Sequence, residues 1–197
     1  MTLRSHSEEL AAAVGRLEEL QAVLDAAASA IAAAVKAGGK VMAAGNGGSA
    51  AEAQHLTGEL TGRLAPDRER GPLPAVALHA DTSSVTALAN DYGYEHVFAR
   101  QVDGLGRAGD VLVVLSTSGA SPNLVEAVNA ARAKDIVTVA LLGPEHRALH
   151  DLCDHVLAVP CGSLQTVQEC HLVLVHALVE AVEDALGAWG RSTQPTP

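Results

Sequence analysis

Residues 40–63 read KVMAAGNGGSAAEAQHLTGELTGR, the most informative segment of the chain. It opens with a short apolar run, residues 40–44, which predicts a strand. Three glycines follow, and a helix is then expected over 49–62, with Ser49 as its N-cap because serine is favoured at that position. A strand, a glycine-rich loop and a helix N-terminus together form a place where backbone N–H groups can approach a ligand closely.

His55 and Glu59 add side-chain chemistry to the same predicted helix. They are four residues apart, so they lie on one face of the helix, one turn from each other. The pair is suited to acid–base catalysis, or to two ligands of a zinc ion completed by His and Gln from another helix. It is equally typical of an exposed pair on a solvated helix face.

Strands and helices alternate along the rest of the chain. Apolar or β-branched runs predict five strands, at 40–44, 75–79, 111–115, 136–142 and 155–159. Helices are expected at 49–62, 82–104 with an interruption, 121–134, 145–152 and 163–186. This alternation predicts an α/β fold with a doubly wound five-stranded parallel sheet, which binds ligands at the carboxyl ends of its strands.

Other segments extend this predicted core. Residues 7–36 repeat apolar positions near the helical period and predict an extra N-terminal helix, whose apolar face a second subunit would cover. The charged, proline-rich run 66–74 predicts a surface loop. No linker interrupts residues 1–187, so one domain is expected there, and the tail 188–197 is expected to be disordered.

Composition and charge narrow the class of protein. The 197 residues are 48% hydrophobic but only 2% aromatic, so the core is expected to consist of Ala, Val and Leu. The net charge is −10 with no basic stripe, which argues against a nucleic-acid partner but not against a small phosphorylated ligand. The three cysteines lack CxxC spacing, and neither a signal peptide nor an apolar run of membrane-spanning length is seen. We therefore expect a reduced, cytoplasmic protein with no membrane partner.

A second candidate site, STSGAS, occupies residues 116–121 directly after the apolar run 111–115. Ser121 is placed to cap a helix whose first residue is Pro122, a position that suits proline. A helix N-terminus surrounded by hydroxyl groups is well suited to a phosphate. The same pattern is also typical of an ordinary serine-capped turn, so the motif alone leaves both interpretations open.

The long C-terminal helix contains a third group of polar residues. Gln168 and His176 lie about 80° apart on an ideal helix, so their spacing alone does not mark them as partners. A histidine in an apolar run such as 172–178 is more often a hydrogen-bonded core residue than a ligand.

The glycine loop also fits the dinucleotide-binding pattern G-x-G-x-x-A over residues 45–50. That pattern requires an acidic residue about 20 positions further on, at the end of the second strand. The next acidic residue after the predicted second strand is Asp81, well past the required position. The spacing therefore argues against a dinucleotide site.

Taken together, the motifs resemble those of the phosphoheptose isomerases, members of the sugar-isomerase (SIS) domain superfamily. They are GNGGS at 45–49, HLTGELTGR at 55–63, NDYG at 90–93, STSGAS at 116–121 and QECHLVLVH at 168–176. The resemblance runs from about residue 7 to 186. It implies a flavodoxin-like parallel sheet, a phosphorylated sugar substrate and a homotetramer with active sites between subunits.

The resemblance also implies a role for each matching residue. Substrate contacts are implied for Asn46, Gly47, Gly48, Ser49, Glu59, Asn90, Asp91 and Gln168, and phosphate contacts for Ser116, Thr117, Ser118 and Ser121. Zinc ligation, with one Zn²⁺ per subunit, is implied for His55, Glu59, Gln168 and His176. Glu59 and His176 are further implied as the catalytic acid–base pair.

Some positions depart from the family pattern. Gln165 replaces an acidic residue of many members, Ala120 replaces a common Asn, and residues 50–52 lack a histidine seen in some. We expect an aldose–ketose isomerase that converts D-sedoheptulose 7-phosphate to D-glycero-D-manno-heptose 7-phosphate, or a close epimer, through an enediol. One alternative is a non-catalytic SIS module, a sugar-phosphate sensor or a replication-initiator adaptor, although such adaptors lack the counterparts of Glu59 and His176. Another is an isomerase of a different phosphorylated sugar, which Gln165 leaves open.

Overall fold

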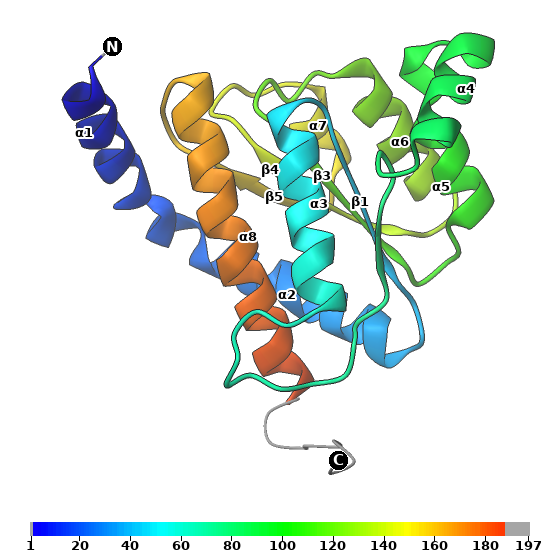
Figure 1. The fold of residues 1–197 in the computed structure, drawn as a ribbon, viewed down its shortest axis with the longest axis horizontal. Coiled ribbons are helices and arrows are strands. Elements are labelled where there is room, and N and C mark those ends of the chain that lie inside the picture. Colours follow the sequence, from blue (N-terminus) through cyan, green and yellow to red (C-terminus); the bar gives the residue numbers. More distant parts are fainter. Residues whose placement is uncertain (1, 188–197) are drawn as a thin grey trace.

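A computed structural model describes residues 2–187 and shows a parallel sheet with helices on both faces (Figure 1). The sheet has five strands in the order β2-β1-β3-β4-β5, which confirms the predicted fold class. Every strand overlaps its predicted run. The strands are β1 (Val41–Gly45), β2 (Ala75–Ala77), β3 (Val111–Ser116), β4 (Val137–Leu142) and β5 (His155–Ala158).

The central strands are buried on both faces, which explains their continuous apolar sequences. In β3, Val111, Val113 and Leu115 pack into one hydrophobic core. Leu112 and Val114 point the other way and pack into a second core. The alternation follows from the two-residue period of a strand, and it is why a parallel sheet needs apolar residues at every position.

Each core is closed by its own group of helices. The first lies under α2 (Gln21–Lys36), α3 (Gly48–Thr61) and α8 (Leu164–Leu186). The second is covered mainly by helices that follow β2, β3 and β4. On that side of the sheet the elements are α4 (Thr82–Tyr92), a 3-10 turn (Tyr94–His96), α5 (Ala99–Leu105), α6 (Pro122–Arg132) and α7 (Ala148–Leu152).

The helical segment predicted over residues 7–36 is present but is not one continuous helix. The segment divides into α1 (Leu3–Val14), a 3-10 turn (Leu17–Leu20) and α2. The break follows Gly15, which caps the end of α1, because glycine is about 1 kcal/mol less favourable than alanine within a helix. Of the α1 residues only Ala13 is buried, so most of this helix surface is exposed as it runs beside α8 (Figure 1).

The strand order places the two motif-bearing loops next to each other. β1 pairs with β2 on one side and with β3 on the other, so the chain leaves β1 and β3 in opposite directions across the sheet. A ligand site is expected at such a switch point, outside the carboxyl ends of the strands. The loop after β1 carries the glycines and the loop after β3 carries the serines.

Two further expectations concern the described part of the chain. No disulfide forms there, and Cys153, Cys161 and Cys170 are all free. Among residues 2–187, no helix combines the length and the apolar character needed to cross a membrane. The predicted tail 188–197 lies outside the described residues.

Candidate active site

The glycine loop turns the chain from β1 directly into α3. Gly47 is the N-cap of α3 and has a φ of 57°, a conformation that glycine adopts without steric cost. The prediction that Ser49 caps this helix is therefore wrong, because the turn at Gly47 starts the helix earlier. Ser49 lies in the first turn of α3 and is buried.

Gly48 allows α8 to approach this loop closely. A Cβ atom at Gly48 would lie 2.6 Å from the side-chain nitrogen of Gln168, so any larger residue would displace that amide. The side chain of Gln168 therefore sits directly over the start of α3. This contact joins the glycine loop to the C-terminal helix, which is far away in the sequence.

The serine loop after β3 and the glycine loop line one small cavity of about 90 Å³. Its wall is formed by Asn46, Ser49, Leu115, Ser116, Thr117, Ser118, Ser121 and Gln168. The structure thus brings together seven polar residues that the sequence motifs singled out. We refer to this cavity as the serine pocket.

The hydroxyl groups of the serine pocket face each other. Ser116 Oγ lies 3.4 Å from both Ser118 Oγ and Ser121 Oγ, and it accepts a hydrogen bond of 3.1 Å from the backbone N–H of Gly119. Ser121 is the N-cap of α6, as expected, but its hydroxyl makes no capping hydrogen bond to the helix. With the N-termini of α3 and α6 both at the pocket, the helix dipoles favour an anion there.

Two residues that the sequence analysis did not single out support the pocket. The Asn46 side chain forms a reciprocal pair with Asn123, with N–O distances of 3.0 and 2.8 Å, and it also accepts 3.0 Å from the Tyr94 hydroxyl. These three residues, with Glu95, Ser121 and Pro122, line a neighbouring cavity of about 500 Å³. In the sequence, Asn123 could have been noticed only by its place directly after Pro122, at an expected helix start next to the serine motif.

A histidine–glutamate cluster forms where α3 and α8 lie side by side (Figure 1). The Nε2 atoms of His55 and His176 are 2.9 Å apart, and His55 Nε2 lies 3.4 Å from Glu59 Oε1. His55 and His176 are exposed, while Glu59 is partly buried. The structure therefore brings His176 to the predicted His55–Glu59 pair from a distant helix.

The donor set of this cluster fits a zinc ion. One ligand atom from each of the three residues lies within 4.8 Å of the others. Ligand atoms about 2.1 Å from a tetrahedral zinc lie about 3.4 Å from each other. The separation of His55 and Glu59 has this value, and the 2.9 Å between His55 and His176 is shorter. Gln168, the predicted fourth ligand, lies on the same helix as His176, and its role as a ligand stays a prediction.

The two histidines of α8 have opposite environments. His171 is fully buried, with its Nε2 donating to the backbone oxygen of Leu142 at 3.2 Å and its Nδ1 3.7 Å from Glu52 Oε2. It is the hydrogen-bonded core histidine that such an apolar run usually contains. His176 is the exposed one, so the core interpretation does not apply to it.

Asn90 and Asp91 lie at the exposed end of α4. The Asn90 amide donates to the Asp91 carboxylate at 2.8 Å, and neither residue lines the serine pocket. Their contact with the sugar stays a prediction. Gln165, the departure from the family pattern, is exposed in the first turn of α8.

A 2-1-3-4-5 parallel sheet with polar loops at its switch point is a flavodoxin-like α/β fold. Residues 6–143 match the SIS domain family, which gives the class of the protein. A curated phosphoheptose isomerase from Streptomyces coelicolor is 51% identical over 181 residues, which cover 92% of this chain and 78% of the relative. The chain therefore belongs to the phosphoheptose isomerase family of SIS-domain proteins.

Solved structures agree with this assignment. A phosphoheptose isomerase from Francisella tularensis superimposes with a TM-score of 0.88 at 35% identity, covering 93% of this chain and 100% of the other. A phosphoheptose isomerase from Neisseria gonorrhoeae superimposes with a TM-score of 0.84 at 40% identity, covering 92% and 97%. The match extends well beyond the motifs, because each superposition covers more than nine-tenths of this chain.

Proposed function

We propose that the protein interconverts D-sedoheptulose 7-phosphate and D-glycero-D-manno-heptose 7-phosphate, or a close epimer, through an enediol. One observation carries this proposal: His176 of α8 meets His55 and Glu59 of α3, on a fold whose serine pocket suits a phosphate. Membership of the phosphoheptose isomerase family supports the same reaction.

The phosphate is bound by the serine pocket in this proposal. Ser116, Thr117, Ser118 and Ser121 supply hydroxyl donors, and the N-termini of α3 and α6 supply a favourable dipole for an anion. No basic side chain lines this cavity among the described residues, which is compatible with the acidic chain as a whole. Binding energy from the remote phosphate positions the reacting carbons at the other end of the sugar.

His176 and Glu59 carry the proton transfers. His176 removes a proton from C1 of the ketose and returns it to C2, while Glu59 moves a proton from the oxygen on C1 to the oxygen on C2. Each transfer needs a group within hydrogen-bond reach of its own atom. Side chains that converge from two helices can approach the sugar from different directions.

The same residues would hold a zinc ion. His55, Glu59 and His176 provide two imidazoles and a carboxylate, and we propose Gln168 as the fourth ligand. When bound, the ion supplies Lewis-acid polarisation of the sugar carbonyl. The chain's own residues fix where that carbonyl lies.

We further propose that the site is completed by a second copy of the chain within a homotetramer. His55 and His176 are exposed in the single chain, although proton transfer is favoured where water is excluded. Leu172 and Val173 of α8 are also exposed, at 38% and 42%. A partner subunit against this helix would cover the apolar side chains and the cluster together.

The decisive experiment is direct. Purified protein is incubated with sedoheptulose 7-phosphate, with and without a chelator, and the formation of an aldose 7-phosphate is followed. Product that disappears with the chelator and returns on adding zinc supports both the reaction and the metal. Tight binding of the sugar phosphate without any product would instead indicate a non-catalytic sensor.

A further inference from the structure

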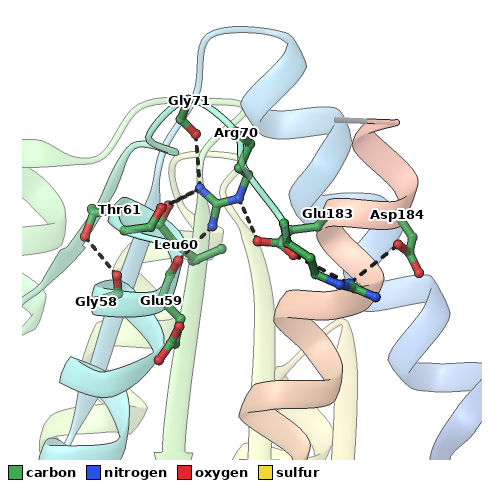
Figure 2. A network of polar contacts seen from close by, with 10 residues as sticks. Gly58, Glu59, Leu60, Thr61, Arg70, Gly71, Glu183 and Asp184 are labelled. Atoms are coloured by element: carbon green, nitrogen blue, oxygen red, sulfur yellow. Dashed lines mark hydrogen bonds and ion pairs between the residues drawn. The ribbon is translucent and has the colours of Figure 1, made fainter. Parts of the chain in front are cut away.

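Arg70 lies in the loop between α3 and β2, yet its side chain is only 3% exposed. The run 66–74 was expected to be a surface loop, but Arg70 and Leu73 are both buried in it. The Arg70 guanidinium is inserted between the end of α3 and the side of α8 (Figure 2). The buried arginine requires an explanation, because burying a charge is unfavourable unless the charge is paired.

The Arg70 guanidinium binds the last carbonyl groups of α3. Nη2 donates to the backbone oxygen of Glu59 at 2.7 Å, and Nη1 donates to the oxygens of Leu60 at 2.9 Å, Gly62 at 3.1 Å and Gly71 at 3.1 Å. The last carbonyls of a helix lack partners within the helix, and a cation there also complements the helix dipole. One of these carbonyls belongs to Glu59, a residue of the proposed acid–base pair.

The other side of the Arg70 guanidinium binds α8. Nε donates to Glu183 Oε1 at 2.7 Å, and the Glu183 side chain is fully buried. Glu183 follows His176 by seven residues, or about two turns, so the two side chains lie on nearly the same face of α8. Arg70 therefore joins the helix end that carries Glu59 to the helix face that carries His176.

A second arginine completes the arrangement. Arg68 Nη1 lies 3.6 Å from Glu183 Oε2 and 3.7 Å from the Asp184 carboxylate, and Arg68 also pairs with Glu180. The Glu183 carboxylate is thus held between two guanidinium groups from one loop. We call Arg68, Arg70 and Glu183 the helix clamp.

We propose that Arg70 and Glu183 are positioning residues, which set the distance between Glu59 and His176 by fixing the end of α3 against α8. This inference rests on the proposed function of Glu59 and His176. A buried ion pair is a poor device for stability alone, because apolar residues of similar volume often replace one without loss. A planar guanidinium carries five N–H donors in fixed directions. By binding four carbonyl oxygens and one carboxylate, the Arg70 guanidinium fixes the relative position of these groups.

The key variant replaces both partners, Arg70→Met with Glu183→Leu, so that no unpaired charge remains buried. We expect kcat for sedoheptulose 7-phosphate to fall about 10- to 100-fold, because displacements of about 1 Å in a catalytic group have effects of this size. KM is expected to stay within about twofold, because the serine pocket lies at the other end of α3. The dissociation constant for zinc, measured without substrate, should rise about 10- to 100-fold.

A matched control is another ion pair with a buried carboxylate, between Lys40 Nζ and Asp110 Oδ2 at 2.5 Å. Asp110→Asn removes a buried charge of the same kind at the opposite end of the sheet. It is expected to lower the unfolding temperature but to leave kcat and the zinc dissociation constant unchanged. If the double variant fails to fold, Glu183→Gln and Arg70→Lys test the same point with smaller changes, and partial recovery of kcat is expected with Arg70→Lys.

Four outcomes separate the two proposals. A folded double variant with wild-type kcat and wild-type zinc affinity would overturn the clamp and leave the proposed function intact. A wild-type protein without isomerase activity, whose zinc affinity still depends on the clamp, would overturn the proposed function alone. A wild-type protein that neither isomerises the sugar nor binds zinc would overturn both. Loss of kcat in Asp110→Asn as large as in the double variant would reduce the clamp to general stability.

Discussion

The two ends of the sheet use polar side chains in opposite ways. At the amino end, Asp110 accepts hydrogen bonds from Lys40 Nζ at 2.5 Å and from the backbone N–H groups of Lys40 and Arg107 at 2.9 and 2.8 Å. Asp154 likewise accepts from the N–H and the hydroxyl of Thr138. These carboxylates tie the start of β1 to the start of β3, and the start of β5 to β4.

At the carboxyl end the polar groups form the serine pocket and the histidine–glutamate cluster. The Ser116 hydroxyl lies 3.4 Å from those of Ser118 and Ser121 at the serine pocket, and His55 and His176 reach the surface. A polar group whose hydrogen bonds are satisfied within the chain stabilises the fold, whereas one that faces a cavity can bind a ligand. Substitutions at the two ends should therefore separate activity from stability.

The largest expected effect is on activity, at the carboxyl end. His176→Gln should lower the isomerisation rate about 10²- to 10⁴-fold, because it removes a proposed acid–base group. The unfolding temperature should stay near that of the wild type, because the side chain is exposed. Turnover with sedoheptulose 7-phosphate and thermal unfolding are measured on the same sample, and near-normal turnover would rule out the assigned role.

The converse prediction concerns Asp110 at the amino end. Asp110→Asn should destabilise the fold by about 1–3 kcal/mol, because hydrogen bonds to a buried carboxylate are lost. Turnover below the unfolding temperature should not change, because Asp110 lies far from the site. Denaturant unfolding checks the first part, and loss of turnover in the folded variant would contradict the comparison.

Acid unfolding provides a second test of the role of Asp110, by comparing the wild type with Asp110→Asn. Burial alone would raise the pKa of Asp110, but the hydrogen bonds from Lys40 and Arg107 hold it below its ordinary value. Such a group stabilises the fold above its unfolded pKa, about 4, and that contribution is lost as the pH falls through the folded pKa. Wild-type stability should therefore fall more steeply below about pH 4 than that of Asp110→Asn. Equal slopes would show that the charge of Asp110 does not stabilise the fold.

A smaller effect on activity is expected from Gly48→Ala. The new Cβ would lie 2.6 Å from the Gln168 amide and displace it from the serine pocket, so activity should fall about tenfold. Stability should change little, because the displaced group is the end of a flexible side chain and alanine favours the helix. Gly104→Ala in α5 is the matched control: its Cβ meets nothing within 4 Å, and activity should be unaffected.

The smallest effect tests the serine loop. Ser121→Ala should raise KM about 2- to 10-fold, the contribution of one hydrogen bond to the phosphate. It should not weaken α6, because Ser121 makes no capping hydrogen bond. Asp81→Ala provides the contrast: Asp81 caps α4 by accepting from the Ser84 N–H at 3.2 Å, so stability should fall by about 1 kcal/mol with KM unchanged. The opposite pattern in the two variants would contradict the distinction between polar groups that are satisfied within the chain and those that face a cavity.

The sequence predicted the features that depend on local periodicity. All five strands were found because each is a short apolar run, and His55 and Glu59 were placed on one helix face by their spacing. One local prediction failed by a small margin, because the positive φ of Gly47 displaced Ser49 from the cap. The N-terminal helical segment was found, and Gly15 divides it.

Features that depend on distant contacts could not be predicted from spacing. The contact of His176 with His55 joins two helices more than a hundred residues apart, and only the family resemblance indicated it. Nothing in the loop 66–74 marked Arg70 as buried, because its partners are backbone carbonyls and a glutamate near the end of α8. Asn123 and Tyr94 were missed for the same reason, since both act by holding Asn46.

Gln168, His176 and Glu183 all belong to α8, one unbroken helix of 23 residues. At 1.5 Å per residue, the Cα atoms of Gln168 and His176 lie about 12 Å apart along its axis. That spacing is as stiff as the helix itself, so the serine pocket, which Gln168 lines, and the cluster that contains His176 keep a fixed separation. A molecule that reaches both must match that length.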